Sequence, residues 1–184
     1  MLIWLILLII IVFCDQLTKW LAIILLQGNP PYYVIDGVLR FSYVENRGAA
    51  FGILDEHRWV FLVLSTVAII GICFYIWRYA PKSRLVMSAL ILIVGGGVGN
   101  MIDRTFLGYV VDFIDFCAFP NLWMWVFNVA DSCVCVGVGL LLLYLIMDTV
   151  NEVKREKAKK NVSESDTTGS DAELNVESDT GDKE

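Results

Sequence analysis

The sequence predicts an integral membrane protein that is mainly α-helical, with four transmembrane helices and a small extracytoplasmic β-sheet between the first two. Hydrophobic residues make up 57% of the 184 residues, and the mean hydropathy is +0.65. A soluble chain of this length does not need so much apolar surface for its core. The apolar residues also gather in runs near or above the ~20 residues that cross a ~30 Å hydrocarbon core.

Four such runs predict the transmembrane helices. They lie approximately at Leu2–Leu26, Trp59–Trp77, Leu85–Ile102 and Leu122–Met147. We interpret the first run as a retained helix, because no basic residue precedes it and no small-residue cleavage site follows it. Four helices place both termini on the same side of the membrane.

Basic residues predict which side is cytoplasmic. Arg78, Lys82 and Arg84 fill the short loop between the second and third runs. Five more follow the last run, at Lys154, Arg155, Lys157, Lys159 and Lys160. Because Lys and Arg concentrate in cytoplasmic loops, we expect this loop and both termini in the cytoplasm.

The C-terminal segment has a different composition from the rest. The net charge is −6, but residues 161–184 contain eight acidic residues and one Lys, a charge of −7, so the preceding residues carry +1. This polar segment has too few large apolar residues to bury a core. We therefore predict a membrane domain at residues 1–150 and a cytoplasmic, charged, disordered tail at residues 151–184.

A β-prone region follows the first helix, at about residues 30–55. Pro30 and Pro31 open it, and the Asp36-Gly37 turn signal separates two runs rich in β-branched and aromatic residues. This pattern is typical of a hairpin.

Polar residues inside the apolar runs are the strongest functional signal. Asp15 and Lys19 are four residues apart on one face of the first helix, while Asn100, Asp103 and Arg104 share a face at the outer end of the third. Asn128 and Asp131 lie within the first turns of the fourth, and Asp112 has apolar neighbours. A carboxyl group in a membrane costs roughly 2.5–3.5 kcal/mol. We expect these groups to meet at one depth in the membrane. Purely structural roles are also open: Asp15 and Lys19 could form a buried ion pair, and Asn128 could hydrogen-bond between helices. Gly95–Gly99 could let helices approach closely.

Asp112 and Asp131 could act as a pair. Two carboxyl groups in a low-dielectric site cannot easily both ionise, so they share a proton. The ionised group can take a proton from water, and the protonated group can donate a hydrogen bond to a substrate carbonyl. This chemistry needs no metal and no cofactor. The five cysteines do not have metal-binding spacing.

Five sequence blocks occur in order: Asp15-Gln16-x-x-Lys19, Asn46-x-Gly48-Ala49-Ala50-Phe51, Gly95-Gly96-x-x-Gly99-Asn100-x-x-Asp103-Arg104, Val110-Val111-Asp112-Phe113 and Phe127-Asn128-Val129-Ala130-Asp131-Ser132. This set resembles the motifs of signal peptidase II, the lipoprotein signal peptidase family, over roughly residues 1–150. The resemblance implies an aspartic endopeptidase of the bacterial inner membrane, with its active site near the outer face. Such an enzyme removes the signal peptide from prolipoproteins by cutting before the diacylglyceryl-modified cysteine.

The resemblance also implies residue roles and partners. Asp112 and Asp131 match the catalytic dyad, and the predicted sheet matches the family's extracytoplasmic β-cradle. The matching substrate-binding or supporting positions are Asp15, Lys19, Asn46, Gly48, Asn100, Asp103, Arg104 and Asn128. The implied partners are diacylglyceryl-modified prolipoproteins, membrane lipids and peptide inhibitors such as globomycin, with no nucleic acid.

Three other readings of the same residues stay open. Asn100, Asp103, Asp112, Asn128 and Asp131 could supply oxygen ligands for Mg²⁺ or Mn²⁺ in a lipid phosphotransferase. Ser132 could act with Lys19 in a serine protease. The carboxylates could also belong to an ion or proton pathway, but a pathway should continue into the cytoplasmic half, where only Asp148 occurs.

Overall fold

The computed structural model describes residues 2–48, 58–118 and 125–178. Parts of three predictions lie outside these residues: positions 49–55 of the β-prone region, the first three residues of the predicted fourth helix, and positions 179–184 of the tail.

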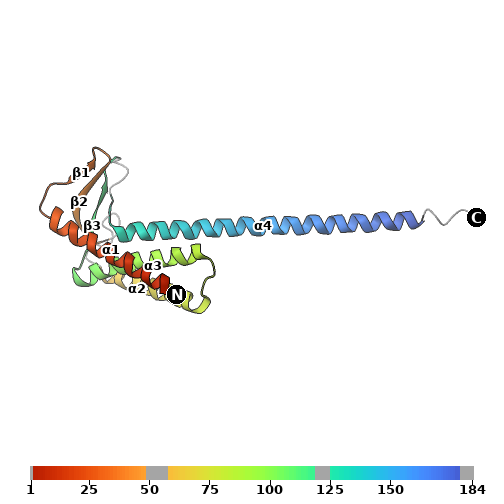
Figure 1. Ribbon diagram of the computed structural model, residues 1–184, viewed down its shortest axis with the longest axis horizontal. Coiled ribbons are helices and arrows are strands. Elements are labelled where there is room, and N and C mark those ends of the chain that lie inside the picture. The colour runs from red at the N-terminus through yellow and green to blue at the C-terminus, as the bar shows by residue number, and fades with distance from the viewer. Residues whose placement is uncertain (1, 49–57, 119–124, 179–184) are drawn as a thin grey trace, which may run out of the picture. The chain divides into compact units, whose positions relative to one another are not determined.

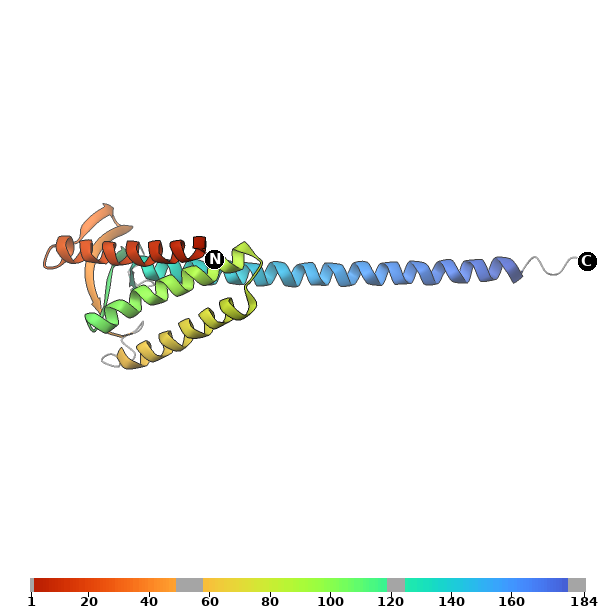
Figure 2. The ribbon, with the colours of Figure 1, turned by 60° about the horizontal axis from the view of Figure 1, so that its bottom comes forward.

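Four helices are long and apolar enough to cross a membrane, which confirms the predicted number. They are α1 (Leu2–Leu26), α2 (Arg58–Tyr79), α3 (Arg84–Phe106) and α4 (Val129–Ser178). In Figures 1 and 2, α3 lies between α1 and α2. It is also the most enclosed of the four, since half of its most apolar stretch is buried, against 17% for α1. Most of α1 and α2 is exposed at the surface of the bundle, while α3 and the buried face of α1 carry the interior polar groups.

The fourth helix begins seven residues later than predicted, at Val129 instead of Leu122. Val126 and Phe127, which were predicted to belong to this helix, form a short strand instead. Asn128 caps the helix: its Oδ1 accepts the backbone N–H of Asp131 at 2.8 Å, and Asp131 Oδ2 accepts the backbone N–H of Asn128 at 3.3 Å. This reciprocal pair satisfies two backbone donors at the helix start and fixes where α4 begins.

The β-sheet has four antiparallel strands in the order β1-β2-β3-β4. The first two, β1 (Tyr32–Ile35) and β2 (Leu39–Asn46), lie between α1 and α2 as predicted, with Gly37 at a positive φ of 70° in the turn. The other two, β3 (Val110–Phe116) and β4 (Val126–Phe127), come from the segment between α3 and α4 and were not predicted. The first four residues of β3 are all buried, so the alternation that reveals a half-exposed strand is absent there.

The sheet packs against the far end of α1 through an apolar cluster built on Ala22, Val111 and Phe113. Phe41 of β2 meets Phe113 edge to face, with ring centroids 6.2 Å apart. This contact anchors β3 beside the end of the helix bundle, and β3 carries Asp112.

Glycines let α3 approach its neighbours closely, as the sequence predicted. A methyl group on Gly96 would meet the carbonyl oxygen of Ala130 and the side chain of Val134. A methyl group on Gly99 would meet the carboxylate of Asp15 and the side chain of Ala130. The start of α4 and the carboxylate of α1 therefore lie directly against the α3 backbone.

Residues 142–184 form a unit separate from residues 1–141. Helix α4 continues within this unit to Ser178, so the structure has helix where the composition predicts a disordered tail. Extending an existing helix avoids the cost of nucleating a new one, and residues 151–160 contain neither Gly nor Pro. The division of the chain at residue 150 stays a prediction.

Candidate active site

The polar residues of α1, α3, β3 and the start of α4 lie in contact with one another. Five of these side chains are almost fully buried, with exposed fractions of 2% or less: Asp15, Lys19, Asp103, Asp112 and Asn128. Among the described residues, no buried side-chain nitrogen or oxygen lacks a hydrogen-bond partner. The desolvation cost of burying these groups is therefore offset by a connected network.

Lys19 is the cation of this network. Its Nζ lies 2.9 Å from Asp15 Oδ2 and 3.0 Å from Asp103 Oδ2, and it donates to Asn100 Oδ1 at 2.9 Å. An ammonium group has three donors, and these contacts use all three. The buried ion pair of Asp15 and Lys19 is thus present, and it extends to a second carboxylate.

The two carboxylates beside Lys19 fix the backbone of the neighbouring elements. Asp15 Oδ1 accepts the backbone N–H of Ala130 in α4 at 2.8 Å. Asp103 Oδ2 accepts the backbone N–H of Val111 in β3 at 3.1 Å. Asp15 and Asp103 therefore hold in place the two segments that carry Asp131 and Asp112.

Gln16 supports the same network and was not among the predicted site residues. Its Nε2 donates to Asp103 Oδ1 at 2.9 Å and to the backbone oxygen of Gly99 at 3.2 Å. It also contacts Asp15 Oδ2 at 3.2 Å. Its position beside Asp15 in the first sequence block was the only signal that could have identified it.

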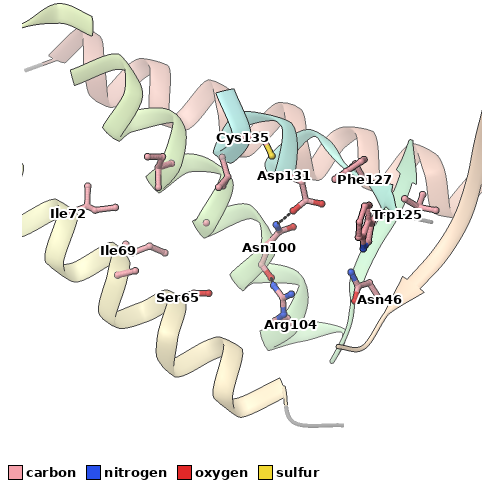
Figure 3. A pocket seen from close by; sticks show the side chains of 15 residues that line it. Asn46, Ser65, Ile69, Ile72, Asn100, Arg104, Trp125, Phe127, Asp131 and Cys135 are labelled. Carbon is pink, nitrogen blue, oxygen red and sulfur yellow. Dashed lines mark hydrogen bonds between the residues drawn. The ribbon is translucent and has the colours of Figure 1, made fainter. Parts of the chain in front are cut away.

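Three asparagines donate hydrogen bonds to the two remaining carboxyl groups. Asn46 Nδ2 donates to Asp112 Oδ2 at 2.9 Å, and Asn128 Nδ2 donates to Asp112 Oδ1 at 2.6 Å. Asn100 Nδ2 donates to Asp131 Oδ1 at 2.7 Å, the bond drawn in Figure 3. Both carboxyl groups are therefore surrounded by N–H donors, which stabilise negative charge.

The orientation of each of these amides is fixed from its other end. The Oδ1 atoms of Asn46, Asn100 and Asn128 accept hydrogen bonds from other donors. These are, respectively, the backbone N–H of Gly48 (3.2 Å), the Nζ of Lys19 (2.9 Å) and the backbone N–H of Asp131 (2.8 Å). Because each oxygen faces a donor, each Nδ2 must face a carboxyl group. Lys19 and Gly48 thus act on the carboxyl pair through the asparagines that they orient.

The pKa of Asp112 is raised from its ordinary value to about 7. Burial is the largest cause, and the charge of Asp131 is the second. The amides of Asn46 and Asn128 act in the opposite direction by stabilising the ionised form. Near neutral pH, the Asp112 carboxyl group can therefore still hold a proton.

A cavity of about 550 Å³ opens beside Asp131. Figure 3 shows Asn46, Asn100, Arg104 and Asp131 at its polar end. The rest of its wall is mainly apolar and comprises Ser65, Ala68, Ile69, Ile72, Ile93, Gly97, Trp125, Val126, Phe127, Val134 and Cys135. Asp112 lies behind Asn46, which lines the cavity and contacts Asp112. The cavity can hold an apolar chain with a polar group at the carboxylate end.

Arg104 lies on the cavity wall near Asp131. Its guanidinium group contacts the Asn100 backbone oxygen at 3.5 Å and stacks 5.2 Å from the centroid of the Phe61 ring. These contacts hold a positive charge at the polar end of the cavity, where it can bind a carbonyl or carboxylate of a ligand.

The proposed Ser132 and Lys19 pair is not brought together. The Ser132 hydroxyl donates to the backbone oxygen of Asn128 at 3.0 Å, and Lys19 is fully engaged with other partners. Among the residues that the structure describes, no group of three or more His, Cys, Asp or Glu is arranged to hold a metal ion.

Comparisons with known proteins support the resemblance noted in the sequence. Residues 7–147 match the model of the family described as "Signal peptidase (SPase) II". The chain is 42% identical over 148 residues to a lipoprotein signal peptidase of Halalkalibacterium halodurans, an alignment that covers 80% of this chain and 94% of the relative. It is also 42% identical over 147 residues to the lipoprotein signal peptidase of Bacillus subtilis, covering 80% of this chain and 95% of that relative.

A solved structure has the same fold. It is a bacterial membrane enzyme determined by the in meso method at 2.3 Å resolution, with a TM-score of 0.72 and 32% sequence identity. The match covers 80% of this chain and 90% of the solved one. On the sequence blocks, the family match and these relatives, the chain belongs to the signal peptidase II family.

Proposed function

We propose that this protein removes the signal peptide from bacterial prolipoproteins, cutting before the diacylglyceryl-modified cysteine, with Asp112 and Asp131 as the catalytic dyad. Family membership supports an aspartic-type lipoprotein signal peptidase that acts on prolipoproteins in a membrane. The observation that carries the residue assignment is that Asn128 contacts both carboxyl groups. Its side chain donates to Asp112 at 2.6 Å, and its backbone N–H donates to Asp131 at 3.3 Å.

The proposed reaction uses the shared proton of the pair. The ionised carboxyl group accepts a proton from a water molecule, and that water attacks the scissile carbonyl. The protonated carboxyl group donates a hydrogen bond to the carbonyl oxygen and stabilises the tetrahedral intermediate. The carboxyl group that took the proton from water then gives it to the leaving amine, the C–N bond breaks, and the pair returns to its singly protonated state. The raised pKa of Asp112 supports this division, because a carboxyl group that titrates near 7 can still donate at neutral pH.

The other predicted residues are proposed to support this pair. Lys19, Asp15 and Asp103 hold α4 and β3 in register, whereas Asn46, Asn100 and Asn128 orient the carboxyl groups. Gly48 fixes the amide of Asn46. Arg104 is proposed to bind substrate, because it lines the cavity beside Asp131. Trp125 and Phe127 also line this cavity, so an inhibitor such as globomycin is expected to compete with substrate there.

The protein is proposed to lie in the bacterial inner membrane with both termini in the cytoplasm and the active site near the outer face. The basic loop of Arg78, Lys82 and Arg84 supports this orientation. The sheet lies at the other end of the bundle from this loop (Figure 2), and its strand β3 carries Asp112. A prolipoprotein would then present its cleavage site at the outer interface.

The alternative functions receive no support from the family match. The family model and the relatives named above are signal peptidases, which supports the protease.

The test is cleavage of a diacylglyceryl-modified prolipoprotein by purified protein in detergent with excess chelator. Asp112→Asn and Asp131→Asn should each lower turnover by at least about 10²-fold, because each removes an acid–base group. Asp115→Asn is the matched control: it lies on the same strand, but its carboxylate pairs with Arg40 at 2.6 Å. Normal turnover in either dyad variant would refute that residue's role, and turnover that requires added metal would refute the mechanism.

A further inference from the structure

A second pocket lies at the other end of the bundle, where the start of α1 is beside the loop that joins α2 to α3 (Figures 1 and 2). Its volume is about 400 Å³. The described residues that line it are Ile3, Trp4, Pro81, Lys82, Ser83, Arg84 and Met87. None of them belongs to the carboxylate site, so the proposed proteolysis does not account for this pocket.

Lys82 and Arg84 give this pocket a positive charge. Both side chains are exposed, and no acidic residue is among the described residues of its wall. The ion pairs found in residues 2–48, 58–118 and 125–157 do not involve either residue. The hydroxyl of Ser83 accepts the backbone N–H of Val86 at 3.4 Å, which leaves its own proton to donate. The wall therefore offers cations and a hydroxyl donor to an anionic group.

An apolar groove of about 520 Å³ continues from this pocket along α1, α2 and α3. Trp4 and Met87 line both cavities, so the two are contiguous. The groove's other lining residues are Leu2, Leu5, Leu8, Cys73, Ile76, Trp77, Ile91 and Val94. The combination of a basic pocket and a long apolar groove is complementary to a charged headgroup attached to a hydrocarbon chain.

We propose that the pocket and the groove together bind one anionic phospholipid. The phosphate lies between Lys82 and Arg84, and an acyl chain follows the groove past Trp4 and Met87. Basic pockets between transmembrane helices on the cytoplasmic side are suited to anionic headgroups. The unpaired positive charge favours an anionic over a zwitterionic lipid, and the groove favours a lipid over free phosphate. In the proposed orientation, this lipid belongs to the cytoplasmic leaflet, opposite the carboxylate site.

The test measures lipid binding to the purified full-length protein by native mass spectrometry from detergent. The probes are dioleoylphosphatidylglycerol, dioleoylphosphatidylcholine and inorganic phosphate. The phosphatidylglycerol should bind more tightly than the phosphatidylcholine, and inorganic phosphate should not compete with it. Lys82→Gln combined with Arg84→Gln should weaken phosphatidylglycerol binding about 30-fold, since each basic residue near a lipid surface is worth about five-fold. Binding of the phosphatidylcholine should weaken less, because its choline cation offsets the charge of its phosphate.

Two further variants complete the design. Lys154→Gln combined with Arg155→Gln removes the same charge from residues that line neither cavity and should keep the parent affinity. Cys73→Trp should narrow the groove and weaken the binding of both lipids. Thermal unfolding in the same detergent verifies that each variant is folded. Equal binding of the two lipids, unchanged binding in the Lys82 and Arg84 double variant, or displacement by inorganic phosphate would each overturn the proposal.

Discussion

Replacing Asn128 separates two roles that the structure assigns to one side chain. Its Oδ1 caps α4, and its Nδ2 donates to Asp112. Asn128→Ser removes the amide donor but keeps a hydroxyl that can cap the helix, whereas Asn128→Ala removes both. The two variants should therefore share one defect and differ in the other.

The shared defect concerns the ionisation of Asp112. A hydrogen bond to a charged group is worth about 1.5–3 kcal/mol, and each pKa unit corresponds to about 1.4 kcal/mol. Because the lost bond favours the ionised form, both variants should raise the pKa of Asp112 by about 1–2 units from its value of about 7. On the alkaline side, kcat/KM falls when the pair loses its shared proton. The pH at which this fall occurs should rise by the same 1–2 units.

The difference between the variants concerns stability. Losing the cap costs about 1 kcal/mol, so Asn128→Ala should melt roughly 2–4 °C below Asn128→Ser. The assay is prolipoprotein cleavage between pH 5 and 9, together with thermal unfolding in the same detergent. An alkaline limb that stays at the parent pH in both variants would refute the action of Asn128 on Asp112. Equal melting temperatures would refute its capping role.

Two other predictions concern packing and pH. Gly99→Ala should destabilise the protein by about 1–3 kcal/mol, because the added methyl group meets the Asp15 carboxylate. Gly139→Ala is the control, since a methyl group there meets nothing within 4 Å and should not change stability. Thermal unfolding of the two variants measures the difference. The pKa of Asp112 is higher in the folded state than in the unfolded state, so the native state binds the proton more tightly. Folding stability should therefore fall by on the order of 4 kcal/mol as pH rises from about 4 to about 7. Asp112→Asn should reduce this loss of stability, which is measured as melting temperature against pH. The same slope in the variant and the parent protein would contradict the titration of Asp112 in the folded state.

Much of the site follows from sequence because its residues occur in short blocks on helices. Asp15 and Lys19 form the expected i, i+4 ion pair, and Asn100 and Asp103 both reach Lys19 from α3. Gln16 was missed as a site residue although it stands in the first sequence block, because its contacts with Gly99 and Asp103 are 83 and 87 positions away in the chain. The roles of Asp112 and Asp131 as catalytic groups remain proposals.

The strand that carries Asp112 shows where sequence reasoning stops. Val110–Phe116 is short and buried along its first four residues, and its partners in β2 lie 64 to 77 positions earlier in the chain. A strand of this kind is defined by pairing, which no local pattern reveals. The late start of α4 has the same origin, because Val126 and Phe127 pair with β3 instead of continuing the helix.

The sequence by itself determined the membrane class, the four helices and the first hairpin, because hydrocarbon thickness and turn chemistry act on consecutive residues. Only the tertiary structure decided which carboxylates hold the backbone, which receive amide donors, and which one lies behind the cavity wall. Asp15, Asp103, Asp112 and Asp131 have the same side chain, and their different roles arise from partners that are mostly distant in sequence. Burial, pKa and amide orientation depend on those partners, so they appear only once the chain is folded.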